Sequence, residues 1–131
     1  MYKRQIAQVT KKTRQSYEKA GRRAETLSCW YLRLKGYLIL ERRYKTRQGE
    51  IDIIAKKRNS IIITEVKQRA HEENLHETVS FKNSQRIINT AEIFMSRHPQ
   101  YLATNFELRF DIIYVIGRWK IIHIKDAFRS Y

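Results

Sequence analysis

Two apolar stretches separated by a short polar segment predict a β-hairpin in the middle of the chain. Residues 50–55 follow Gly49 and read Glu-Ile-Asp-Ile-Ile-Ala, and residues 61–67 are rich in isoleucine, threonine and valine. β-Branched residues of this kind favour strands. After Lys56, residues 57–60 read Lys-Arg-Asn-Ser and are typical of a turn. This hairpin restricts the chain to folds that contain an antiparallel strand pair.

The register of the hairpin brings two carboxylates together. A four-residue turn pairs Lys56 with Ile61 and then sets Asp52 opposite Glu65, and such cross-strand partners lie roughly 5 Å apart. Facing carboxylates repel each other, and neighbouring isoleucines increase the cost of leaving their charges unpaired. A hard divalent cation offsets this cost, and Mg²⁺ is the usual ion at a sparse carboxylate site completed by water and phosphate. Mn²⁺ is the other candidate.

Lys67 adds a catalytic amine to this pair. It lies two residues after Glu65, on the same face of the strand, and the register sets it opposite Glu50. An ammonium group beside a metal can orient or deprotonate an attacking water and neutralise charge on phosphorus. The pattern therefore indicates phosphodiester hydrolysis. Solvated ion pairs of Asp52 and Glu65 with Lys67 and nearby arginines explain it equally well, and both interpretations stay open on the pattern alone.

The charge of the chain points to a polyanionic partner. Twenty-seven Lys and Arg residues against 13 Asp and Glu residues give a net charge of +14, and this excess favours nucleic acid. Half of the excess lies in the first 23 residues. We expect residues 1–15 to be a basic N-terminal extension and residues 16–131 to be one domain. A solvated basic arm without a specific ligand would carry the same charge.

The composition excludes several other classes of protein. A single cysteine, Cys29, rules out an intramolecular disulfide and a zinc site built from thiolates. No apolar run approaches the roughly 20 residues that cross a bilayer. No secretory signal follows Met1. We therefore expect a cytoplasmic protein without a membrane partner.

Hydrophobic periodicity predicts the remaining elements, in the order αβββαββ. Apolar positions recur at helical spacing over residues 16–35, and Gly36 ends that helix. Residues 37–40 form the first strand, before a charged stretch at 41–48. After a loop at 70–78, a second helix spans residues 80–98 and ends before Pro99. Two further strands follow at residues 106–115 and 119–125, which completes an α/β domain.

The motifs around the hairpin resemble those of a known family. Residues 49–55 (GEIDIIA) and 63–69 (ITEVKQR) are similar to the "GEIDLIA…FVEVKxR" signature of the YraN family, uncharacterised bacterial proteins that resemble archaeal Holliday junction resolvases of the PD-(D/E)XK nuclease superfamily. The resemblance covers residues 17–128. Weaker matches lie at Gly21, Glu25, Gly36, Tyr37, Arg43, Tyr44, Lys82, Arg86, 109–113, Ala127 and Phe128. Arg43 stands where the family usually has asparagine.

The resemblance implies a restriction endonuclease-like fold, in which helices flank a central mixed β-sheet. It implies that Asp52 and Glu65 bind a divalent metal and that Lys67 is the catalytic lysine. Glu25, on the first helix, becomes a candidate additional metal ligand. The implied function is a metal-dependent DNA endonuclease of the resolvase type, and a homodimer is compatible with action on two strands.

Basic residues near this site are candidates for holding nucleic acid. Lys82, Gln85 and Arg86 begin the second helix, where the amide groups and the helix dipole favour phosphate. Arg69 and Arg43 are the other two candidates. A solvated helix end explains the first three equally well.

Other reactive or aromatic residues are expected to have structural roles. Asp111 is expected to form an internal ion pair with Arg109. Cys29, Tyr44, Trp30 and Trp119 are expected to fill the core, although the three aromatic residues could also stack on bases. The four histidines, His71, His76, His98 and His123, are expected to be exposed or to cap helices, with a minor chance that His71 and His76 touch a phosphate.

Two alternative functions remain open at this point. A nucleic-acid-binding protein with a vestigial nuclease site would bind its ligand without cleaving it. An assembly factor would use the basic extension to contact a ribosome or a membrane.

Overall fold

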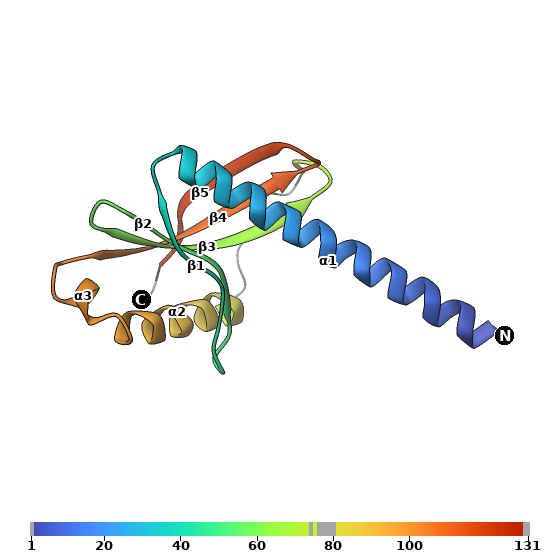
Figure 1. Cartoon of the computed structure of the whole chain (residues 1–131), viewed down its shortest axis with the longest axis horizontal. Helices are drawn as coiled ribbons and strands as arrows, with labels where there is room; N and C mark the ends of the chain where they lie inside the picture. Colours follow the sequence, from blue (N-terminus) through green and yellow to red (C-terminus); the bar gives the residue numbers. More distant parts are fainter. Residues whose placement is uncertain (1, 74, 76–80, 130–131) are drawn as a thin grey trace.

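A five-stranded sheet forms the centre of the fold, with its strands in chain order (Figure 1). The computed structural model describes residues 2–73, 75 and 81–129. The elements are α1 (Tyr2–Leu34), β1 (Leu38–Lys45), β2 (Glu50–Lys57), β3 (Ser60–Arg69), α2 (Phe81–Ser96), α3 (Pro99–Leu102), β4 (Glu107–Ile116) and β5 (Lys120–Phe128). Apart from the short helix α3, which begins at Pro99, this is the predicted order αβββαββ.

The sheet is mixed, as the resemblance implied. β1, β2 and β3 are antiparallel to one another, β3 and β4 are parallel, and β4 and β5 are antiparallel. A parallel pair needs a crossover connection, and α2 lies within the one between β3 and β4. The architecture is consistent with a restriction endonuclease-like fold.

The two long helices cover opposite faces of the sheet (Figure 1). Leu32 of α1 belongs to one core cluster, together with Ile53 and Ile62. Phe94 of α2 belongs to the other cluster, which contains Ile54 and Ile63. Successive residues of a strand point to opposite faces, so β2 and β3 are apolar at adjacent positions because both of their faces are covered.

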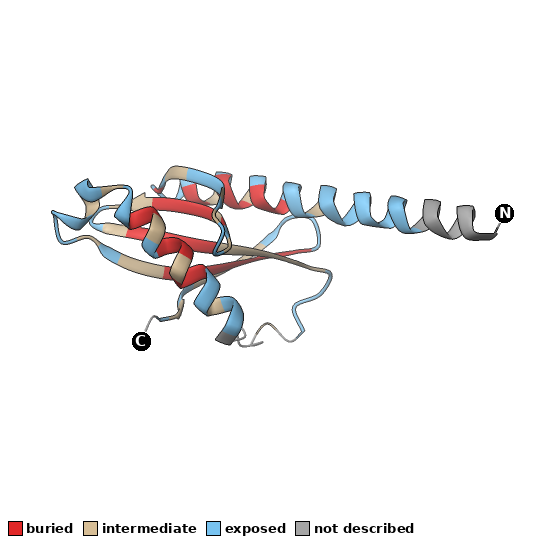
Figure 2. Ribbon diagram, turned by 90° about the horizontal axis from the view of Figure 1, so that it is seen from below, coloured by how far each residue is buried: buried red, intermediate tan, exposed pale blue. Residues whose placement is uncertain are grey.

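Helix α1 is much longer than predicted. It ends where expected, because Gly36 has a φ of +90° and the N–H of Tyr37 donates to the carbonyl of Leu32. Its start is at Tyr2, so the prediction that the helix begins near Ser16 is wrong. Figure 2 shows that the first half of this helix is exposed where its side chains are described. A sequence reading based on apolar periodicity misses such a segment, because it buries little.

Strand β1 also extends beyond its predicted end, through Lys45. The charged stretch continues the strand because Tyr44 packs edge-on against Phe94, with ring centroids 5.5 Å apart. A register shift between Ile39 and Glu41 bends the strand, and Arg43 adopts a φ of 52°.

Three aromatic or histidine predictions were wrong. Trp30 and Trp119 are 58% and 77% exposed and fill no core. The side chain of His123, expected to be exposed, is only 4% exposed.

His98 caps α2, because its Nδ1 lies 2.7 Å from the carbonyl oxygen of Phe94. His71 is exposed, and His76 lies outside the described residues.

The predicted loop at 70–78 also lies partly outside the described residues. Among the helices that are described, none combines the length and the apolar character that a membrane span requires.

Candidate active site

The β2–β3 hairpin has the predicted register where the two strands pair. The predicted partners Asp52 and Glu65, and Glu50 and Lys67, lie beyond the paired residues. Lys56 pairs with Ile61, and the ladder runs to the pair Ile53 and Thr64, which are the immediate neighbours of Asp52 and Glu65. Beyond that pair, the N–H of Val66 donates a 2.8 Å hydrogen bond to Oδ2 of Asp52. The side chain of Asp52 therefore takes the place of a backbone acceptor at the point where the two strands separate.

Asp52 and Glu65 line one hollow between the hairpin and α2, which we call the α2-side hollow. Arg86 lines it from α2, so a predicted nucleic-acid-binding residue faces the two carboxylates. The complete lining is Gly49, Glu50, Ile51, Asp52, Thr64, Glu65, Asn83, Arg86 and Ile87. The arrangement sets two acids and one guanidinium around a single space.

Gly49 permits the close approach of α2 to the hairpin. A Cβ atom at this position would lie 3.1 Å from Oγ1 of Thr90 and 3.4 Å from the carbonyl oxygen of Arg86. Contacts this short force a neighbour to move. The glycine of the GEIDIIA motif is thus one reason why Arg86 reaches the hollow.

Two oxygens that border the hollow are unsatisfied. Oε2 of Glu65 and Oγ1 of Thr64 are buried and have no hydrogen-bond partner in the part of the chain that the structure describes. An orphaned buried acceptor is costly unless a donor or a cation satisfies it. The carboxylate oxygens therefore fit a divalent cation that draws its remaining ligands from water or phosphate.

The ionisation of Asp52 supports the same assignment. Burial, together with the negative charges of Glu65, Glu25 and Glu50, raises the pKa of Asp52 to about 6, against the lowering effect of the Val66 N–H. A cation in the hollow would favour the charged form of Asp52 and relieve this repulsion.

Glu25 lies on the other side of Asp52, in a second hollow that we call the α1-side hollow. Its lining is Glu18, Gly21, Arg22, Glu25, Arg43, Lys45, Glu50, Asp52 and Val66. Oε1 of Glu25 accepts a 3.1 Å hydrogen bond from Arg42, and Oε2 accepts a 2.9 Å hydrogen bond from Arg43. Both oxygens are therefore engaged by arginines. Over the described residues, no group of three or more His, Cys, Asp or Glu residues has a geometry that would hold a metal. The role of Glu25 as an additional ligand stays a prediction.

The other predicted site residues have different environments. Lys67 is partly buried on β3, two positions after Glu65, and its side chain makes no hydrogen bond or ion pair with any residue that the structure describes. Arg69 donates to the carbonyl of Gln68 and lies over the ring of Tyr114. Neither residue lines the α2-side hollow.

The beginning of α2 contributes to the α2-side hollow one residue that was predicted, Arg86, and one that was not, Asn83. Lys82 is exposed, and Gln85 is exposed and donates to Oδ1 of Asn89. Asn83 and Arg86, one helical turn apart, line the hollow instead. Sequence reasoning missed Asn83, although its spacing of three from Arg86 was the available signal.

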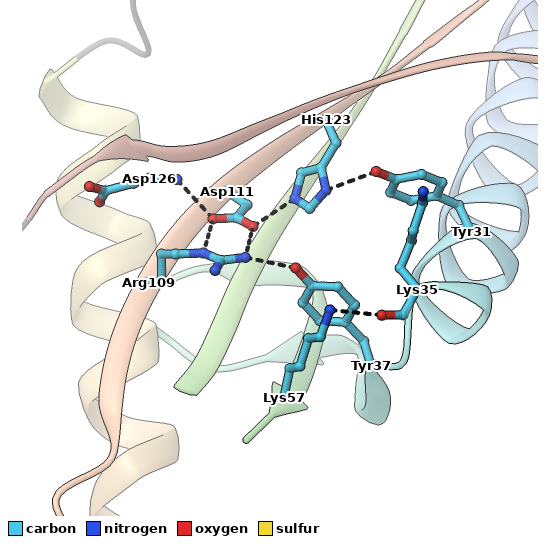
Figure 3. Close-up of polar contacts among 8 residues, drawn as sticks. All are labelled: Tyr31, Lys35, Tyr37, Lys57, Arg109, Asp111, His123 and Asp126. Carbon is cyan, nitrogen blue, oxygen red and sulfur yellow. Dashed lines mark hydrogen bonds and ion pairs between the residues drawn. The ribbon is translucent and has the colours of Figure 1, made fainter. Parts of the chain in front are cut away.

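A second polar cluster, centred on Asp111, is buried between the sheet and α1 (Figure 3). Arg109 donates to both oxygens of Asp111 at 2.8 and 2.7 Å, which confirms the expected ion pair. Nε2 of His123 lies 2.7 Å from Oδ2 of Asp111, and its Nδ1 lies 3.2 Å from the hydroxyl of Tyr31 on α1. The cluster therefore links β4, β5 and α1.

The hydrogen bonds of this cluster keep Asp111 charged. Burial alone would raise its pKa, but the bonds from His123, Arg109 and the N–H of Asp126 hold the pKa of Asp111 below its usual range. Both oxygens of this carboxylate already accept hydrogen bonds from groups of the protein. Its environment is that of a structural residue.

Comparison with known proteins gives the family of the chain. A family model described as "Uncharacterised protein family UPF0102" matches residues 24–115. The chain belongs to UPF0102. This is the YraN-like family that the hairpin motifs indicated.

Similar UPF0102 proteins match nearly the whole chain. A UPF0102 protein of Agrobacterium fabrum is 45% identical over 115 residues, which cover 88% of this chain and 93% of the relative. One from Bartonella tribocorum is 42% identical over 123 residues, which cover 93% of this chain and 92% of the relative. The UPF0102 assignment names no activity, so function rests on the geometry of the site.

Proposed function

We propose that this UPF0102 protein is a metal-dependent endonuclease that hydrolyses phosphodiester bonds in DNA. The observation that carries the proposal is the α2-side hollow, where Asp52 and Glu65 face one space and Oε2 of Glu65 has no partner among the described residues. The net charge of +14 favours a polyanionic substrate. The finer assignment to a resolvase-like enzyme rests on the family resemblance of the hairpin motifs.

Each residue of the site has a distinct role in this proposal. Asp52 and Glu65 would hold Mg²⁺ or Mn²⁺, and the Val66 N–H fixes the orientation of Asp52. The ion would polarise the phosphodiester and lower the pKa of bound water. Arg86 would neutralise a phosphate oxygen from the opposite wall of the hollow. Phosphate contacts of this kind position a strand without reading its sequence, so we expect a preference for structure over sequence.

Lys67 would act on the attacking water. Its position two residues after Glu65 puts both side chains on one face of β3. From there the ammonium group would orient the water and offset the charge that develops on the phosphate oxygens.

The test compares the wild type with Asp52→Ala, Glu65→Ala and Lys67→Ala on linear, nicked and branched DNA and on RNA. Each preparation is assayed with Mg²⁺, Mn²⁺ or EDTA. We expect wild-type cleavage that depends on the metal, and a loss of at least about 100-fold in each variant, the range typical of a lost catalytic group. Glu92→Gln changes an exposed acid of α2 that lines neither hollow, and it serves as a control for purification. Equal cleavage by all the proteins would identify a contaminant and contradict the proposal.

A nucleic-acid-binding protein with a vestigial site is the second candidate. It is favoured by the two arginines that occupy both oxygens of Glu25, because they leave Asp52 and Glu65 as the available acids. Such a protein would bind DNA with the same salt dependence and cleave none of the substrates.

A further inference from the structure

The first half of α1 extends beyond the sheet, as Figures 1 and 2 show. Residues 10–19 are all exposed, whereas Ala24, near the middle of the helix, is buried against the sheet. We call residues 2–20 the α1 arm. Because its described side chains are exposed, the arm gains little stability from packing against the domain, and an isolated helix of this length is only marginally stable in water.

The exposed surface of the arm and its root is strongly basic. Between residues 10 and 23 the structure describes six exposed cationic residues and one exposed acid, Glu18. The cations are Lys11, Lys12, Arg14, Lys19, Arg22 and Arg23. Arg14 pairs with Glu18 at 3.4 Å, but both side chains are more than half exposed, so this pair is weak. The charge therefore remains available to a polyanion.

The C-terminal end of the arm and the helical turn that follows it, residues 18–23, which we call the root of the arm, lie at the proposed active site. Glu18 and Arg22 line the α1-side hollow, and Asp52 lines both this hollow and the α2-side hollow. A strand of nucleic acid that reaches Asp52 on this side meets the root of the arm. The arm then leads away from the carboxylates.

Helical geometry divides the cations of the arm into two faces. Lys11 and Arg14 precede Glu18 by seven and four positions, which sets them within about 40° of it around the helix axis. They therefore share the face that lines the hollow. Lys12 and Lys19 lie roughly 100–120° away from Glu18, on another face of the same helix.

We propose that the α1 arm holds a duplex of DNA against the carboxylate site through the face that carries Lys11 and Arg14. This inference rests on the proposed nuclease function and assigns its substrate a duplex flank on one side of the cut. Lys11 and Arg22 are separated by roughly 17 Å along the axis, about the length of five base pairs. A straight helix can lie along a rigid duplex over that distance, whereas a flexible single strand does not present its phosphates in a fixed straight line.

Duplex binding by two matched double variants tests the proposal. Lys11→Gln with Arg14→Gln removes two charges from the face of the hollow, and Lys12→Gln with Lys19→Gln removes two charges from the other face. Affinity for a 20-base-pair duplex is measured with the full chain in EDTA, over a range of salt concentrations. Each lost phosphate contact lowers the slope of log K against log salt by about 0.9. We expect a decrease of nearly 2 for the first pair and little change for the second.

Several outcomes would overturn the proposal. Equal losses in the two double variants would show that the arm attracts DNA by its total charge alone. An unchanged affinity in the first pair would also contradict it. A loss of binding to anionic lipid vesicles, with duplex binding intact, would assign the face to a membrane surface. Circular dichroism of each variant checks that the helix is retained.

The length of the duplex provides a second measurement. Shortening the flank on the arm's side to below about five base pairs is expected to remove the difference between the first pair and the wild type. The nuclease proposal fails separately. If no preparation cleaves DNA but the first double variant alone loses duplex affinity, the proposal for the α1 arm is supported and the nuclease proposal is contradicted. If the wild type cleaves DNA and the two double variants bind the duplex equally, the nuclease proposal is supported and the proposal for the α1 arm is contradicted.

Discussion

The N–H of Val66 donates a 2.8 Å hydrogen bond to Oδ2 of Asp52, at the point where β2 and β3 stop pairing. This bond fixes the carboxylate beside Glu65 without neutralising it. Burial still raises the pKa of Asp52 to about 6, so the folded protein carries a strained charge at neutral pH. A site that stores unfavourable charge is typical of one that binds a cation.

The first prediction is that Asp52→Asn abolishes metal-dependent activity but stabilises the metal-free protein. The folded pKa of about 6 lies above the ordinary value of 3.8, so ionisation of Asp52 destabilises the fold as pH rises between these values. Asparagine removes the charge and keeps an oxygen for the Val66 N–H. Because Asp52 is partly exposed, we expect a gain of about 1–2 kcal/mol at pH 7. Urea unfolding in EDTA measures it.

The same unfolding experiment at pH 4 and below provides the control. Asp52 is mostly protonated in the folded wild type there, so the gain from Asp52→Asn should shrink as pH falls toward the unfolded pKa. A variant that is less stable than the wild type at pH 7 would contradict the assignment of a destabilising charge.

Metal affinity should also depend on pH. Protons compete with a cation for Asp52 below its pKa of about 6, so affinity falls as pH decreases through this value. We expect Mg²⁺ or Mn²⁺ to bind about tenfold more weakly at pH 5 than at pH 8, from this one group. Calorimetric titration of the metal-free chain measures the change. Equal affinity at both pH values would argue that Asp52 is not a ligand.

Gly49→Ala should disturb the contact between the hairpin and α2. The added methyl group would meet Oγ1 of Thr90 at 3.1 Å and the carbonyl oxygen of Arg86 at 3.4 Å, so this part of α2 must give way by a few tenths of an ångström. We expect a loss of stability of about 1–3 kcal/mol and weaker DNA binding, since overpacking usually costs that much.

Gly21→Ala is the matched control for this change. A Cβ atom at Gly21 meets no atom within 4 Å, and alanine favours a helix over glycine by about 0.5–1 kcal/mol. We therefore expect stabilisation. A loss of stability in both variants would indicate that the effect at Gly49 is not one of packing. Chemical denaturation and duplex affinity are measured for both.

The hairpin and its acids could be predicted because their geometry is local. A short turn fixes the pairing of Lys56 with Ile61, and this pairing continues to Ile53 and Thr64, the residues next to the two acids. The partners of the acids depend on tertiary packing, which no local pattern contains. Arg86 reaches the hollow because α2 approaches Gly49 closely, whereas Gln85, beside it in sequence, bonds to Asn89.

The misplaced residues have a similar explanation. His123 is buried because Asp111 and Tyr31, which are distant in sequence, both contact its ring. Trp119 is exposed because it follows Gly117 and Arg118 in the turn between β4 and β5, although its residue type favours a core. Residue type alone indicates average burial, and these positions depart from the average because of where the chain turns.

Asp111→Asn should destabilise the fold strongly. It removes the charge that pairs with Arg109, which is only 27% exposed, and weakens the bond to His123. Breaking a buried ion pair by removing one partner costs about 3–5 kcal/mol. Because its pKa is held below the usual range, the contribution of Asp111 is present at neutral pH and lost as pH falls through that lowered pKa.

The Asp111→Asn variant also distinguishes a role in stability from a role in metal binding. At a temperature where Asp111→Asn is still folded, its metal affinity should equal that of the wild type, since the cluster shares no lining residue with the α2-side hollow. Thermal unfolding and metal titration are the two measurements. A normal melting temperature combined with lost activity would make Asp111 part of the site.

Arg43 provides the last prediction, because its backbone and its side chain have opposite preferences. Its φ of 52° disfavours most residues but is tolerated by asparagine. Its guanidinium donates to Oε2 of Glu25 at 2.9 Å, and that carboxylate is nearly buried. Both Arg43→Asn and Arg43→Ala lose this bond and leave Arg42 as the partner of Glu25. We expect both variants to be destabilised, Arg43→Ala by about 0.5–1 kcal/mol more, because only alanine retains the full backbone strain. Urea unfolding of the two variants at pH 7 measures the difference, and equal stabilities would show that the φ of Arg43 carries no strain.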